Sequence, residues 1–286
     1  VPDAFLAEMT GMVTGARKAG VPLGIDAVRR LVAATNLDMY KREERILELI
    51  DEETAAMLAD MQGMSPMQCT FFALWGSRTV EGKMLSMRNL DWLSQTGMHE
   101  DRLITAYHPE DGVPFVSMGY AGVIGCLAGM NAAGVSFSQI GAFSASEELD
   151  GIPWTMLART TLQNASNLEQ GVDIVKNGRH TIGYNYLVAD GDPSHFGTDA
   201  FRPRAAAFET NHTCCELFFD NDPKEAAATW TDADGNHHRY GLPLTEGILR
   251  ADTAFGPRTR ALQAADDGPG APENTGNPLG RDGAGS

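Results

Sequence analysis

Two neighbouring stretches of sequence decide the fold: Cys69-Thr-Phe-Phe-Ala-Leu-Trp75 and Met84-Leu-Ser-Met-Arg-Asn-Leu-Asp-Trp92. Both are rich in residues that favour β-strands, and a glycine in the gap between them suits a turn. We therefore predict a β-hairpin whose second strand ends beside the start of the first. This pairing places Arg88 and Asp91 next to Cys69. Because residues three apart on a regular strand face opposite ways, a bend or bulge is needed to aim both side chains at the cysteine.

The rest of the central region alternates between strand-like and helix-like segments. A strand-rich block is followed by a helical block and then by a return to strands, which is typical of two antiparallel sheets with helices stacked outside them. The sequence therefore predicts an α+β fold, a four-layer αββα sandwich. The strands are expected at residues 103–107, 115–120, 122–128, 134–140, 184–189 and 205–210, and the helices at 153–162 and 167–176.

The two ends of the chain differ from this central region. Apolar residues recur at helical spacing from residue 3 to about 62, which predicts two or three helices ahead of Cys69. Beyond Thr245 we expect a helix from about Glu246 and another over 257–265. The last residues are rich in Gly, Pro, Asn and Asp and are predicted to be disordered. The predicted organisation is a helical segment over 1–68, a domain over 69–265 and a tail over 266–286.

Composition and charge exclude several classes of protein. Subtracting 38 acidic from 22 basic residues leaves a net charge of −16, which repels phosphate backbones and acidic lipid surfaces, so nucleic acid is not an expected partner. No apolar run approaches the roughly 20 residues that a membrane-spanning helix needs. The four cysteines lack zinc-site spacing. We expect a soluble protein, either cytoplasmic or exported with its leader already removed.

The hairpin motif resembles a known family of enzymes. Cys69-Thr70, a glycine-containing turn and Arg88-Asn-Leu-Asp-Trp92 are similar to the cysteine Ntn-hydrolases related to isopenicillin-N acyltransferase (acyl-coenzyme A:6-aminopenicillanic acid acyltransferase), and more distantly to choloylglycine hydrolases and acid ceramidases. The likeness covers roughly residues 5–265. It includes an N-terminal helix at 8–15, a central turn at 129–135, a later strand at 184–190 and an asparagine-bearing strand end at 210–212.

This resemblance implies a self-processing enzyme that needs no cofactor. The bond between Gln68 and Cys69 is cut by the protein itself, which removes the residue 1–68 segment as a propeptide and gives Cys69 a free α-amine. An α-amine has an ordinary pKa of roughly 7.7 to 8.0, so it can take the thiol proton near neutral pH. The thiolate then attacks a linear amide and forms a thioester, which water or a second amine resolves.

The resemblance also implies a role for individual residues. Asp91 accepts hydrogen bonds from the Cys69 ammonium, Arg88 favours the thiolate by its positive charge, and Asn211 donates to the developing oxyanion. A further family arginine corresponds to Arg258 or Arg260. If the family likeness is set aside, Arg88 and Asp91 are equally well explained as a structural ion pair.

The chain departs from the family in the substrate region. Relatives carry an asparagine on the strand after the central turn, whereas this chain offers Gln139 or Ser138 as substitutes. Asn131 in the turn fits a structural role better than a substrate contact. Relatives also continue into closing strands where this chain enters its tail. The residues assigned to substrate binding are Thr70, Asn131, Gln139, His212 and Arg258.

The predicted activity is that of an amidohydrolase or acyltransferase acting on a small-molecule linear amide. An acyl-acceptor amine or acyl-coenzyme A is the partner expected if the thioester is transferred instead of hydrolysed. One alternative is an amidase of N-acyl lipids, resembling a ceramidase. The other is a catalytically silent Ntn-fold protein that only binds.

Overall fold

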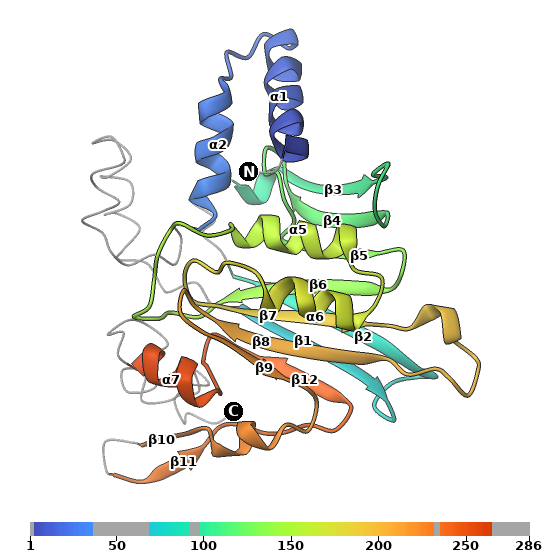
Figure 1. The fold of residues 1–286 in the computed structure, drawn as a ribbon, viewed down its shortest axis with the longest axis vertical. Coiled ribbons are helices and arrows are strands. Elements are labelled where there is room, and N and C mark those ends of the chain that lie inside the picture. The colour runs from blue at the N-terminus through green and yellow to red at the C-terminus, as the bar shows by residue number, and fades with distance from the viewer. Residues whose placement is uncertain (1–2, 37–68, 92–97, 232–234, 265–286) are drawn as a thin grey trace.

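The computed structural model describes residues 3–36, 69–91, 98–231 and 235–264 (Figure 1). The predicted tail at 266–286 and the second half of the predicted propeptide lie outside these residues. The helices are α1 (Asp3–Lys18), α2 (Ile25–Ala34), α5 (Trp154–Asn164), α6 (Leu168–Lys176) and α7 (Pro257–Ala264). Short 3-10 turns are η2 (Met98–Glu100), η3 (Pro193–His195) and η4 (Pro223–Ala227).

The strands form two antiparallel sheets and a small ribbon. The smaller sheet has the order β12-β1-β2, and the larger has the order β3-β4-β5-β6-β7-β8-β9. The ribbon pairs β10 (Thr229–Thr231) with β11 (His237–Arg239). The bounds in the two sheets are β1 Cys69–Gly76, β2 Gly82–Leu90, β3 Arg102–Tyr107, β4 Phe115–Tyr120, β5 Ala128–Asn131, β6 Val135–Gly141, β7 Tyr184–Asp190, β8 Arg204–Thr210, β9 Cys215–Phe218 and β12 Gly247–Arg250. The predicted fold class, α+β with two antiparallel sheets, is confirmed.

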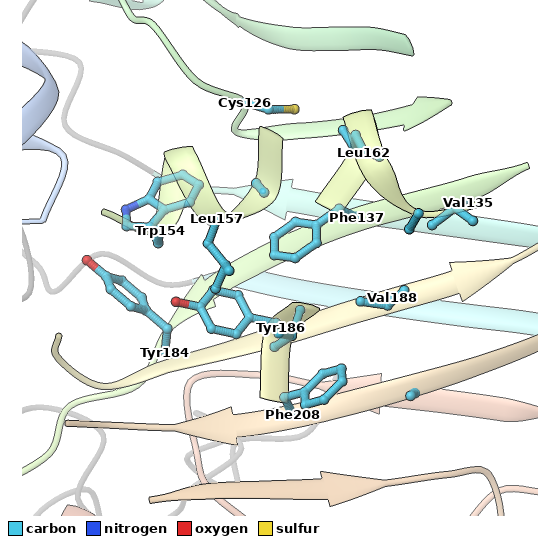
Figure 2. Close-up of a cluster of buried hydrophobic side chains, with 14 of the residues drawn as sticks. Cys126, Val135, Phe137, Trp154, Leu157, Leu162, Tyr184, Tyr186, Val188 and Phe208 are labelled. Atoms are coloured by element: carbon cyan, nitrogen blue, oxygen red, sulfur yellow. The ribbon is translucent and has the colours of Figure 1, made fainter. Parts of the chain in front are cut away.

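Strands β6 to β8 of the seven-stranded sheet are buried on both faces because different layers cover them, whereas β3 and β4 are partly exposed. Strand β7 contributes to the packing on both faces, because its successive side chains point to opposite faces of the sheet. Tyr186 and Val188 pack under α5 and α6, as Figure 2 shows. Leu187 and Ala189 pack instead against the three-stranded sheet. Strand β1, the central strand of the smaller sheet, therefore lies over β6 and β7 of the larger sheet.

The N-terminal helices add a further layer beyond α5. Apolar residues from α1 and α2 pack with Ile124 and Met156, which joins both helices to the domain. The Trp154 indole N–H donates to the carbonyl of Thr35 at 2.7 Å, and Thr35 directly follows α2. None of the helices in the described ranges is long and apolar enough to cross a bilayer.

Two predicted elements are wrong. Residues 122–127 form a loop, because Gly122 and Gly125 take positive φ angles and the Cys126 N–H donates to Thr155 of α5. The strand is β5, which begins at Ala128. The helix predicted from about Glu246 is strand β12. A short apolar run does not distinguish helix from strand, and here antiparallel pairing with β1 decides the outcome.

Candidate active site

Cys69 is the first residue of β1 and points between the two sheets. The side chains of β1 alternate between buried and half-buried, with Cys69, Phe71, Ala73 and Trp75 on the buried face. The Cys69 side chain is 7% exposed. It belongs to the core between the sheets, and Leu90 of β2 packs against that core. The cysteine thus lies at the margin of a packed interior.

The hairpin forms as predicted, with the end of β2 beside the start of β1. Cys69 pairs with Leu90, and Phe71 pairs with Arg88. The turn contains Glu81 and Gly82, both at positive φ, which glycine adopts without strain. Arg88 therefore shares the inward face with Phe71. Leu90 is the last residue of β2, so Asp91 already lies beyond the strand.

Arg88 is held by Gln139 on β6. The Arg88 Nε donates to the Gln139 main-chain carbonyl, and Nη2 donates to the Gln139 side-chain oxygen at 3.1 Å. Strand β5 pairs with β6 only at Ser136 and Phe137, so this later part of β6 has an open edge for the guanidinium. Of the two substitutes named for the missing asparagine, Gln139 positions Arg88, and Ser138 is a buried residue that lines the neighbouring cavity.

The carboxylate that contacts the Cys69 nitrogen comes from Asp252, which the sequence did not single out. The Cys69 N–H donates to both Asp252 carboxylate oxygens, at 3.1 and 3.2 Å. Asp91 is exposed, and its carboxylate accepts a bond from the Asn89 amide at 2.9 Å. The sequence does carry one indication of Asp252: Arg250-Ala-Asp252 places an arginine shortly before an aspartate, as Arg88 and Asp91 do. The helix predicted from about Glu246 hides this indication, because a helix there would not pair with β1.

Electrostatics join these charges into one cluster. Burial raises the pKa of Asp252 to about 7, and the negative charge of Asp91 adds to this rise. The Cys69 N–H and the positive charge of Arg88 act in the opposite direction. Asp252 is therefore partly protonated at neutral pH and can both accept and donate a proton there.

Asn211 lies in a tight turn directly after β8. Its side-chain oxygen accepts the N–H groups of Thr213 and Cys214, each at 3.0 Å, and its side chain also hydrogen-bonds to the Cys214 thiol. The positive charge of Arg258 reaches the same thiol, whereas Arg260 donates to the carbonyl of Ala227 at 2.9 Å. Of the two candidate arginines, Arg258 is the one near Asn211. The oxyanion role of Asn211 stays a prediction.

Three other predicted contact residues lie in different surroundings. The amide of Asn131 donates to the carbonyls of Leu162 and Ala165, and its oxygen accepts two main-chain N–H groups, so the turn engages the whole side chain. Thr70 follows Cys69 and faces away from the larger sheet. The His212 ring lies 4.0 Å from the Asp150 carboxylate. Gln68 lies outside the described residues.

The remaining thiols are less suited to act as nucleophiles. Burial raises the pKa of Cys126 to about 11 and that of Cys215 to about 11, and it also raises the pKa of Cys214. Thiolates attack and thiols do not, so the raised pKa values disfavour the reactive form of these three groups. In the described parts of the chain, no group of three His, Cys, Asp or Glu residues is arranged to hold a metal ion.

A cavity of about 1130 Å³ opens beside the cluster. It lies between β2 and the part of the larger sheet formed by β3 to β6. Arg88 and Leu90 line the end of the cavity nearest to Cys69, whose strand partner is Leu90. Most of the remaining wall is apolar and includes Leu103, Met118 and Phe137. The site therefore combines a polar cluster with a large apolar recess.

Comparison with known proteins adds an uncharacterized protein from Archaeoglobus fulgidus, which is 27% identical over 193 residues. That match covers 67% of this chain but only 31% of the relative, so the chain spans less than a third of its length. Among solved structures, an N-acylethanolamine-hydrolyzing acid amidase ortholog from Caenorhabditis elegans is 14% identical, with 64% and 69% of the two chains covered and a TM-score of 0.44. Penicillin V acylase from Agrobacterium tumefaciens is 16% identical, with 53% and 49% covered and a TM-score of 0.35. These structural likenesses are too weak to bear on activity.

A family model gives the stronger result. The model described as acyl-coenzyme A:6-aminopenicillanic acid acyl-transferase matches residues 78–227. The matched region includes the second strand of the hairpin, Arg88, Asp91, the helices α5 and α6 and the Asn211 turn. Because this match spans more than half of the chain and agrees with the motif around Cys69, the chain belongs to the acyl-coenzyme A:6-aminopenicillanic acid acyl-transferase family.

Proposed function

We propose that this protein is a self-processing cysteine amidohydrolase or acyltransferase that cuts linear amides through a thioester at Cys69. One observation carries the proposal: the Cys69 N–H is hydrogen-bonded to a carboxylate, at a strand start that lies beside Arg88 and the cavity. A nitrogen held in this way is suited to become the base of an N-terminal nucleophile. Family membership supports the same class of chemistry.

Scission of the bond between Gln68 and Cys69 creates the active form. The freed α-amine then accepts the thiol proton, since its ordinary pKa of roughly 7.7 to 8.0 lies close to working pH. The thiolate attacks the substrate carbonyl and forms a thioester, and the amine gives its proton to the departing substrate nitrogen. Water or an acceptor amine resolves the thioester. Residues 1–68 are the propeptide in this scheme.

Two neighbouring residues support the nucleophile. The guanidinium of Arg88, fixed by Gln139, stabilises negative charge on the sulfur. The negative charge of Asp91 favours the protonated amine from a distance, because Asp252 makes the direct contact with the Cys69 nitrogen. Asn211 donates from its amide to the oxyanion of the tetrahedral intermediate, with Arg258 close to it. A single oxyanion donor of this kind contributes a factor of about 10² to 10³ in rate.

The cavity favours a substrate whose acyl group is apolar. Its walls are lined mostly by apolar side chains, and Arg88 and Leu90 stand at the end nearest to Cys69. An acyl chain in the cavity directs its carbonyl carbon toward the sulfur. This arrangement favours N-acyl compounds, including N-acyl lipids, over amides whose acyl part is positively charged, since Lys83, Arg88 and Arg102 also line the cavity.

The test compares the unmodified chain with Cys69→Ala. We expect the 30.8 kDa chain to yield a fragment that begins Cys-Thr-Phe-Phe and then to hydrolyse at least one of penicillin V, an N-acyl amino acid or an N-acylethanolamine. Intact mass spectrometry and N-terminal sequencing follow the cut, and product release follows turnover. Cys69→Ala abolishes both, because no sulfur remains to attack.

A matched control replaces another thiol. Cys215→Ala removes a half-buried cysteine outside the cluster, and both processing and turnover are expected to persist. Turnover that survives in Cys69→Ala contradicts the proposed mechanism. A chain that stays whole, with no turnover, identifies a silent binding protein instead.

A further inference from the structure

The loop that carries Asp252 is held in place by buried polar side chains from three different elements. Asn185 of β7 donates to the carbonyl of Ala251 at 3.0 Å, and Gln263 of α7 donates to the carbonyl of Asp252 at 2.7 Å. Glu209 of β8 accepts the next N–H groups along the chain, from Phe255 at 2.9 Å and Gly256 at 2.7 Å.

Asn185, Glu209 and Gln263 are almost fully buried. Their hydrogen bonds to the loop hold it in one arrangement, because breaking any of them leaves a buried polar group unpaired. The side-chain oxygen of Asn185 itself has no hydrogen-bond partner among the described residues. The Asp252 carboxylate is thereby aimed at one atom, the Cys69 nitrogen.

That nitrogen needs a proton when the peptide bond that precedes it breaks. In the proposed processing reaction the Cys69 sulfur bonds to the carbonyl carbon of residue 68, and the bond from that carbon to the Cys69 nitrogen breaks. An amide nitrogen leaves poorly as an anion, so a general acid within hydrogen-bond reach accelerates the step. At 3.1 and 3.2 Å, the Asp252 oxygens are within that reach.

We propose that Asp252 is the acid that protonates the Cys69 nitrogen during self-cleavage and afterwards the carboxylate that holds the new amine. This inference rests on the proposed function, because it requires that scission occurs at Cys69. Asp252 in its acid form transfers one proton to the departing nitrogen and becomes a carboxylate. The proton released by the attacking thiol passes through solvent to the new amine, so that an ammonium group faces the Asp252 carboxylate. Water then cleaves the thioester and restores the thiol.

The charges around Asp252 suit this task. Burial raises its pKa to about 7, with Asp91 on the β2 side adding to the rise and Arg88 of β2 opposing it. The acid form is therefore present up to neutral pH and is lost above it. Processing should slow as the pH rises through about 7, on the alkaline side of its optimum.

The experiment follows processing in full-length chains made in a cell-free system and sampled over time from pH 5 to 9. In Asp252→Asn, which keeps the shape but has no acid proton, we expect scission to slow by about 10²-fold at pH 6. Its alkaline decline near pH 7 should also disappear. Asp173→Asn makes the same charge change at an exposed position of α6 and should match the unmodified chain. Loss of the alkaline decline separates an acid role from a structural one.

Each outcome decides the question. An Asp252→Asn chain that is cut at the unmodified rate with the unmodified pH profile overturns the inference and leaves the proposed function standing. If the unmodified chain is never cut at Cys69, both fall. If Asp252→Asn fails to fold, Asp252→Glu decides, because it keeps an acid there. The rate of self-cleavage in Asp252→Glu must still fall as the pH rises on the alkaline side. A rate that does not fall as the pH rises overturns the inference.

Discussion

The two strands that flank β1 both end beside its start. Each carries an arginine at or near its last residue and is followed by an aspartate, Arg88 with Asp91 and Arg250 with Asp252. Arg88 of β2 and Arg250 of β12 both pair with Phe71, so they lie in one row on one face. Arg88 is half-buried, lines the cavity and binds Gln139. Arg250 is fully buried and lines no part of the cavity.

The partners of Arg250 are charged. Its guanidinium pairs with Glu209 at 3.0 Å and with Glu225 at 2.7 Å, and it stacks on the ring of Phe255 at 4.4 Å. The aspartates differ in the opposite way: Asp91 is exposed, whereas Asp252 is half-buried and its carboxylate accepts the Cys69 N–H. In the proposed mechanism, the first pair supplies the arginine and the second supplies the aspartate. Identical residue types therefore acquire different surroundings from the surfaces they face.

The largest expected effect is a difference in unfolding free energy between variants of the two arginines. Arg250→Met leaves the Glu209 carboxylate without its buried countercharge, and breaking such a pair costs about 3–5 kcal/mol. The free energy of unfolding, measured in urea at pH 7, should fall by that amount. Arg88→Met removes hydrogen bonds next to an open cavity and should cost only about 1 kcal/mol. Equal losses of unfolding free energy in Arg250→Met and Arg88→Met contradict this difference between a buried and a half-buried arginine.

A smaller effect tests the geometry of Arg88. Arg88→Lys keeps the charge but loses the planar fork that reaches two oxygens of Gln139 at once. We expect kcat/KM to fall by about 10²-fold through misplacement of the charge, with little change in unfolding free energy. Arg204→Lys, at an exposed ion pair with Glu169, is the matched control and should leave kcat/KM unchanged. Unchanged turnover in Arg88→Lys identifies Arg88 as a purely structural residue.

The smallest effect links the two aspartates. The negative charge of Asp91 makes it harder for Asp252 to lose its proton. Asp91→Asn therefore lowers the pKa of Asp252, and the alkaline decline in processing rate moves to lower pH. The same cell-free assay measures this shift, with Asp173→Asn as the control. A decline that stays in place or moves to higher pH contradicts the coupling.

Local patterns predicted the hairpin well because its strands are close in sequence. The pairing of Arg88 with Phe71 follows from one turn and from period-two alternation, and the structure has the end of β2 beside the start of β1, as predicted. Strand β12 was predicted as a helix because four residues carry too little periodicity to identify it. The sequence does not identify Asp252 for the same reason, since its place beside Cys69 depends on β12. The sequence also does not choose between Gln139 and Ser138, because no local pattern indicates which side chain on β6 faces Arg88.

The sequence by itself determined where the proposed nucleophile lies: Cys69 begins a strand, and the second strand of the hairpin carries Arg88 and leads into Asp91. Only the tertiary structure decided which carboxylate meets the Cys69 nitrogen. Asp252 is 183 residues from Cys69 in the sequence. It lies beside Cys69 because β12, which precedes it, pairs with β1 and buries the side chains of Ile248 and Arg250 against the larger sheet. Burial then raises the pKa of Asp252, and neither the pairing nor the burial can be read from a short segment of sequence.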